Sequence, residues 1–101
     1  MSLIERKSGV VNLKPGIDLV ASQCAALKQE FLELINGGEK KIVIDLSETE
    51  MIDSSGIGLL ISIRNSLVNS GGGEIELTHL SDDLLQLFRV MKLDNHFKIS
   101  G

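Results

Sequence analysis

The hydrophobic positions of this chain fall into short blocks, and several of these blocks have the composition and spacing of β-strands. Residues 2–7 and 9–14 resemble two short strands joined at Ser8 and Gly9, and the second carries the β-branched pair Val10-Val11, so we predict a hairpin. Residues 40–46, with the sequence KKIVIDL, form a nearly continuous apolar run. Such a run is typical of a strand that is covered on both faces, so we expect this segment to be the central strand.

Two further strands are expected later in the chain. Residues 74–77 alternate between polar and apolar side chains, and they follow the glycine run of residues 71–73. Residues 97–99 are apolar at both ends and predict a short last strand.

Three other blocks have the spacing of amphipathic helices. One stripe recurs at steps of three and four from Ser22 onward and stops at Asn36-Gly37-Gly38. Its members are Val20, Cys24, Leu27, Phe31, Leu34 and Ile35. Residues 56–69 predict a second helix whose apolar side is Leu59, Leu60, Ile63 and Leu67. Residues 81–91 predict a third, with Ser81 as its N-cap and two acids in its first turn.

The predicted order of elements is ββαβαβα, with a possible final strand. Strands and helices that alternate after a hairpin favour a mixed sheet with parallel right-handed crossovers, which is the α/β class. At 101 residues the chain has the length of one domain. We therefore expect a single domain over residues 1–101, with a four- to five-stranded sheet and three to four helices.

Charge and composition exclude several classes of function. The net charge of −4 disfavours binding to nucleic acid or to anionic membrane surfaces. No segment is long and apolar enough to span a bilayer, and residues 1–7 lack the apolar region of a signal peptide, so we expect a cytoplasmic protein. Cys24 is the only cysteine and fits a small hydrophobic role. The two histidines have no metal-site spacing, and we expect neither a metal nor a cofactor.

One polar cluster interrupts the apolar pattern between two predicted elements. Asp53, Ser54 and Ser55 stand between the predicted central strand and the helix that follows it. A single oxygen is enough to cap a helix, whereas this cluster supplies three side chains. Ligands in open α/β sheets bind beyond the carboxyl ends of the strands, and helix N-termini stabilise phosphate. Ser54 is therefore well placed to carry a covalent phosphate, although capping alone remains an alternative.

A catalytic role for these serines has little support in the sequence. The nucleophile of a serine hydrolase usually follows a glycine by two residues, and Ile52 stands at that place before Ser54. The glycine run of residues 71–73 lacks the Lys-Ser/Thr ending of a phosphate-binding loop. We therefore expect no enzyme and no ATP site of its own, so a phosphate on Ser54 would come from another protein.

The same residues resemble a known family. IDL at 44–46, IDSSGIG at 52–58 and SDDLLQLFRVMKL at 81–93 are similar to the STAS domain family, and specifically to its stand-alone bacterial anti-sigma factor antagonists. The resemblance extends from about Gly16 to Ile99. Lys92 stands where family members commonly have a glycine.

The resemblance implies a phosphorylation-gated switch in bacterial signal transduction and transcription regulation. It makes Ser54 the phosphoacceptor, supported by Asp53, Ser55 and Gly56. It implies two partners, which are an anti-sigma factor with serine kinase activity that binds the unphosphorylated form and a metal-dependent serine phosphatase that resets it. The partner-binding surface is expected on the loop before Ser54 and the first turns after it, namely at Glu48, Thr49, Glu50, Met51, Ile52 and Gly58.

Two other functions are compatible with the sequence. The protein could be a constitutive STAS interaction subunit of a lipid-transport or signalling complex, in which Ser54 is only structural. An enzyme acting on a small molecule would need an acid/base pair, and the sequence presents none.

Overall fold

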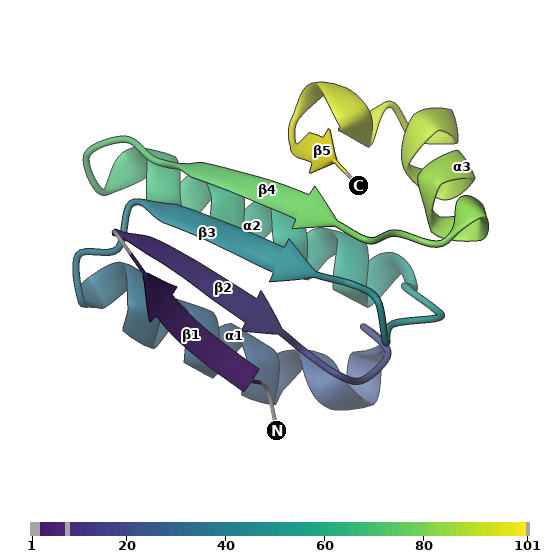
Figure 1. Cartoon of the computed structure of the whole chain (residues 1–101). Helices are drawn as coiled ribbons and strands as arrows, with labels where there is room; N and C mark the ends of the chain where they lie inside the picture. The colour runs from purple at the N-terminus through teal and green to yellow at the C-terminus, as the bar shows by residue number, and fades with distance from the viewer. Residues whose placement is uncertain (1–2, 8, 101) are drawn as a thin grey trace.

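Five strands form one mixed sheet in the order β1-β2-β3-β4-β5 (Figure 1). The computed structural model describes residues 3–7 and 9–100. The strands are β1 (Leu3–Lys7), β2 (Val10–Lys14), β3 (Lys41–Asp45), β4 (Glu74–Thr78) and β5 (Lys98–Ser100). β1 pairs antiparallel with β2, and every later pair is parallel. The hairpin and the central position of β3 are therefore confirmed, while residue 2 and Ser8 lie outside the described residues.

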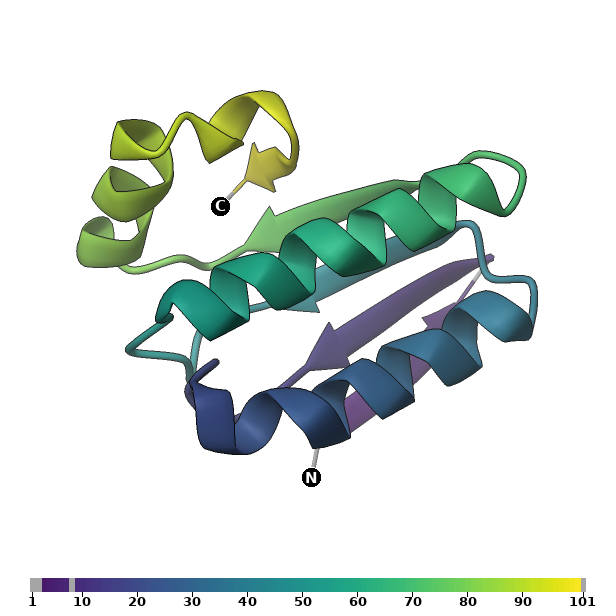
Figure 2. The same ribbon diagram turned by 180° about the vertical axis from the view of Figure 1, so that it is seen from behind.

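The helices α1 (Ala21–Asn36), α2 (Ser54–Asn69) and α3 (Asp82–Val90) alternate with these strands as predicted. A short 3-10 helix, η1 (Leu93–Asn95), precedes β5. Figure 2 shows α1 and α2 side by side across one face of the sheet, and α3 with η1 beyond the β4 edge. The fold class predicted from the order of elements is confirmed.

Only one face of the sheet is covered by helices, and this corrects one expectation. In β3, Ile42 and Ile44 are fully buried beneath the helices, whereas Lys41, Val43 and Asp45 face the other side and are half-exposed. The prediction that this strand is covered on both faces is wrong. Its apolar run reflects the preference of β-branched residues for extended backbone as much as burial.

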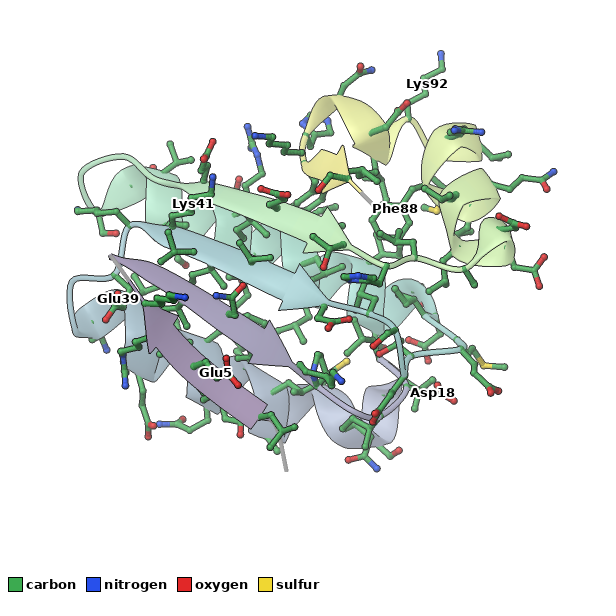
Figure 3. All side chains as sticks on the ribbon, in the orientation of Figure 1. Glu5, Asp18, Glu39, Lys41, Phe88 and Lys92 are labelled. Atoms are coloured by element: carbon green, nitrogen blue, oxygen red, sulfur yellow. The ribbon has the colours of Figure 1, made fainter. Side chains whose placement is uncertain are left out.

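The core between the sheet and the helices is mainly aliphatic. On α1, Leu27, Phe31, Leu34 and Ile35 are buried, and Cys24 packs half-buried beside them. On α2 the predicted stripe is buried throughout. Phe88 of α3 packs edge-to-face against Phe97, with their ring centroids 6.3 Å apart, and Figure 3 shows Phe88 pointing inward from α3.

The bounds of α2 and β5 differ from the sequence prediction, and Lys92 has an unusual backbone. α2 begins at Ser54 rather than Gly56, so the polar cluster belongs to the helix start itself. β5 is shifted by one residue, because Phe97 turns into the core instead of pairing. Lys92 adopts a left-handed backbone with φ 58°, a conformation that glycine favours, and this agrees with the glycine that the family resemblance implies at this position.

Candidate functional site

The starts of α1 and α2 are joined by main-chain hydrogen bonds at the carboxyl end of the sheet. The N–H of Leu19 donates to the carbonyl of Met51 at 3.0 Å, and the N–H of Asp53 donates to the carbonyl of Leu19 at 3.2 Å. Leu19 and Ile52 thereby form an isolated parallel bridge. The segment before α1 thus fixes the loop that leads into α2.

Two polar side chains complete this connection. Oδ1 of Asp18 accepts hydrogen bonds from the N–H groups of Glu50 and Met51, at 2.9 and 3.2 Å. Oγ1 of Thr49 donates to the carbonyl of Ile17 at 2.8 Å. Figure 3 labels Asp18 at the end of the sheet toward which β2, β3 and β4 run. This role of Asp18 could not be predicted from the sequence, because its partners are more than thirty residues away in the chain.

Asp53 links both helices through its carboxylate. It is the N-cap of α2, where its Oδ1 accepts from the N–H of Gly56 at 3.1 Å. Its Oδ2 accepts from the N–H of Ala21, the first residue of α1, at 3.2 Å. Val20, the N-cap residue of α1, makes no side-chain cap, so Asp53 serves both helix starts. Both carboxylate oxygens are therefore engaged in positioning Ser54.

Gly56 supports the site through its lack of a side chain. A Cβ at this position would lie 2.2 Å from the carbonyl oxygen of Leu19 and 2.8 Å from Cγ2 of Ile52. A Cβ atom does not approach another heavy atom this closely, so the first turn of α2 can approach Leu19 only with glycine here.

Ser54 and Ser55 occupy the first turn of α2 with exposed side chains. Within residues 3–7 and 9–100, neither hydroxyl nor either backbone N–H has a hydrogen-bond partner. Free N–H groups and the positive end of the helix dipole favour an anion at this position. The hydroxyl of Ser54 is therefore accessible, and the backbone beside it can stabilise negative charge.

The loop before Ser54 divides into exposed and buried positions. Glu48, Glu50 and Met51 are exposed, as is Gly58 on α2, and the side chain of Met51 is 58% exposed. Thr49 and Ile52, also predicted to contact a partner, are buried. Their side chains pack beneath the loop. Fewer of the predicted residues are therefore available to contact a partner than the sequence suggested.

The loop is bordered by an acidic groove of about 440 Å³. Asp18, Glu50 and Asp83 supply three carboxylates to its lining, and His79 is the single potential cation among the lining residues. The full lining is Asp18, Leu46, Ser47, Thr49, Glu50, Met51, His79, Ser81 and Asp83. Negative charge therefore surrounds the exposed methionine.

Asp45 stabilises the start of this loop. Its partial burial raises the pKa of the carboxyl group, but the hydrogen bond from the N–H of Ser47 at 2.9 Å and the nearby His79 and Lys14 outweigh burial, so the pKa of Asp45 is lowered. The carboxylate is thus held in its charged form where the chain leaves β3.

Cys24 lies beside this region as a free, half-buried cysteine. Burial, followed by the charge of Asp53, raises the pKa of its thiol. Because the thiolate is the nucleophilic form, a raised pKa lowers the fraction of the thiol that is nucleophilic at neutral pH. No group of three or more His, Cys, Asp or Glu side chains among the described residues is arranged to hold a metal ion. Within the same part of the chain, none of the helices has the length and apolar character to cross a membrane.

Replacing Asp53 with alanine is expected to lower the free energy of unfolding by about 1–2 kcal/mol, because two backbone N–H groups lose their acceptor. The melting temperature should fall by roughly 5–15 °C. Asp82→Ala, which removes an exposed first-turn acid of α3 with no hydrogen bond of its own among the described residues, should cost only a few tenths of a kcal/mol. Equal losses in urea unfolding would contradict the role of Asp53.

The comparison with protein families assigns most of the chain to one family model. Residues 4–100 match the model described as "Mlab, STAS domain". A protein of Thermotoga neapolitana, named as the homolog of a candidate anti-sigma factor antagonist, is 33% identical over 91 residues, which cover 89% of this chain and 80% of that protein.

Solved structures show the same architecture. A candidate anti-sigma factor antagonist of Thermotoga maritima matches with a TM-score of 0.89 at 29% identity, over 97% of this chain and 84% of that one. The anti-sigma factor antagonist SpoIIAA of Bacillus matches in its unphosphorylated and phosphorylated forms, with TM-scores of 0.77 and 0.74. These matches cover all of this chain and 88% and 92% of those chains, and at 16% and 17% identity they bear on the fold alone.

Proposed function

The chain belongs to the STAS domain family, and from this we propose that it is an anti-sigma factor antagonist whose binding to its partner is switched off by phosphorylation of Ser54. The observation that carries the proposal is the exposed hydroxyl of Ser54 at the start of α2, beside backbone N–H groups that lack acceptors in the described residues. The relative from Thermotoga neapolitana supports the antagonist role through its name.

The partner proposed for the unphosphorylated form is an anti-sigma factor with serine kinase activity. Phosphoryl transfer would form a bond between Oγ of Ser54 and the γ-phosphorus of ATP and release ADP. The sequence carries no phosphate-binding loop, so the ATP is proposed to be bound by the partner. A metal-dependent serine phosphatase would return the protein to its binding form.

Gating is proposed to act through local charge. A phosphate adds about −1.5 to −2 charges at neutral pH. The first turn of α2 can stabilise this charge, whereas a partner that packs closely against Met51 and Ser54 would have to desolvate it. Because Asp53 and Gly56 fix the helix start on Leu19, we expect the backbone to stay in place when Ser54 is modified.

The proposal is tested by mapping the phosphate after incubation with a serine-kinase anti-sigma factor of the same genome and ATP. Mass spectrometry should place one phosphate on Ser54 in the wild type and in Ser55→Ala. Ser54→Ala should remain unmodified. A phosphate on Ser55, or on another residue of the wild type, would contradict the assignment of Ser54.

A constitutive interaction subunit is the second candidate, because the cap by Asp53 and the close packing of Gly56 on Leu19 account for the start of α2 without any modification of Ser54. In such a subunit the start of α2 would serve only for packing and binding. The two functions differ in one outcome, because a negative charge at Ser54 would leave the affinity of a constitutive subunit for its partner unchanged.

A further inference from the structure

A second polar groove lies at the opposite end of α2 from Ser54. It has a volume of about 270 Å³ and is formed by the second half of α2, the start of β4 and the segment from η1 to β5. Arg64 follows Ser54 by ten residues, which places it about 15 Å further along the helix. The lining residues are Arg64, Val68, Gly73, Glu74, Ile75, Asn95, His96, Phe97 and Lys98.

Most charges near this groove are already balanced. Lys41 pairs with Glu74 at 2.9 Å and with Glu76 at 3.7 Å, and Lys98 lies 4.0 Å from Glu76. Figure 3 labels Lys41 on the open face of the sheet. The hydrogen bond and the charge of Lys41 lower the pKa of Glu74, so that carboxylate stays charged and paired with Lys41. Two lysines and two glutamates therefore offset each other.

Arg64 takes no part in these ion pairs. Its side chain is half-buried in the groove, yet within residues 3–7 and 9–100 it has neither an acidic partner nor a hydrogen-bond acceptor. A guanidinium group carries five N–H donors in a planar fork.

We propose that this groove binds a small polar molecule through a carboxylate or phosphate group held by Arg64. The fork of arginine matches two oxygens of either group with parallel hydrogen bonds. The neighbouring side chains of His96 and Asn95 add donors and acceptors for a polar body. The groove is smaller than the 300–1,000 Å³ of typical ligand sites, which favours a small ligand.

This site is independent of phosphorylation at Ser54. The two regions share α2 but no residue, so a ligand at Arg64 would give the protein a small-molecule input at the end of the helix away from the partner surface. Absence of ligand binding at Arg64 would therefore leave the proposed switch at Ser54 unaffected, and the reverse also holds.

The test is an NMR titration of the full chain with glycerol 3-phosphate and, separately, with succinate. We expect saturable shifts of the backbone amides of residues 64 and 95–98 with at least one of the two, and the comparison tells phosphate from carboxylate. Arg64→Gln should weaken binding at least about tenfold, whereas Arg64→Lys, which keeps the charge without the fork, should weaken it less.

Arg89→Gln is the matched control. It removes the same charge from an exposed arginine of α3 that lies outside the groove, and it should leave the titration unchanged. Each variant should keep the wild-type spectrum in the absence of ligand. Shifts that do not saturate with either compound, that persist in Arg64→Gln, or that cluster at residues 54–56 would overturn the proposal.

Discussion

Replacing Gly56 with alanine is expected to lower the free energy of unfolding by about 2–3 kcal/mol, the largest loss of stability that we predict for one added methyl group. The new Cβ would stand 2.2 Å from the carbonyl oxygen of Leu19 and 2.8 Å from its Cβ. A main-chain oxygen cannot rotate away as a flexible side chain can. Relief therefore requires α2 to move away from Leu19, which would also disturb the hydrogen bond from the N–H of Asp53.

Gly58→Ala provides a matched control two residues along the same helix. A Cβ at Gly58 would meet nothing within 4 Å, and alanine favours a helix over glycine by about 0.5–1 kcal/mol. This variant should therefore be more stable than the wild type. Urea unfolding followed by circular dichroism measures both changes. Equal effects of the two substitutions, in either direction, would show that contact with Leu19 is not the cause.

Ser54→Asp is expected to weaken binding to the proposed partner, an anti-sigma factor with serine kinase activity, by at least about tenfold, with roughly a hundredfold for phosphoserine itself. A hundredfold corresponds to about 2.7 kcal/mol. The aspartate supplies one charge where phosphate supplies nearly two, which explains the smaller effect. Stability should change little, because Ser54 is exposed and makes no hydrogen bond within the described residues.

Asn65→Asp is the control for charge alone. It adds the same negative charge to an exposed position of α2, eleven residues beyond Ser54, and should leave affinity nearly unchanged. If it weakened binding as strongly as Ser54→Asp, the effect would come from the net charge of the protein rather than from the start of the helix. Isothermal titration calorimetry gives both affinities.

Much of the fold could be predicted because the apolar spacing is regular and the stop signals are clear. The stripe of α2 and the glycines after α1 and α2 define their elements without tertiary information. The burial of β3 could not be predicted in the same way, because Val43 fits an extended backbone whether or not its side chain is covered. Which face the helices cover depends on how the whole chain packs.

The candidate site was predicted where it depends on neighbouring residues and missed where it depends on distant ones. The position of Ser54 at a helix start follows from the local sequence. Three other features depend on contacts between segments more than thirty residues apart, and no local sequence pattern predicts them. They are the hydrogen bonds of Asp18, the burial of Thr49 and the hydrogen bond from Ala21 to Asp53. The groove around Arg64 likewise gathers residues from three separate parts of the chain.

The most direct test of the central claim compares the affinity of one preparation for the proposed serine-kinase partner before and after complete phosphorylation, with a non-hydrolysable ATP analogue present to prevent further transfer. The account predicts that affinity falls about a hundredfold on phosphorylation and returns when a phosphatase removes the phosphate. An affinity that stays the same while Ser54 is fully phosphorylated would contradict it.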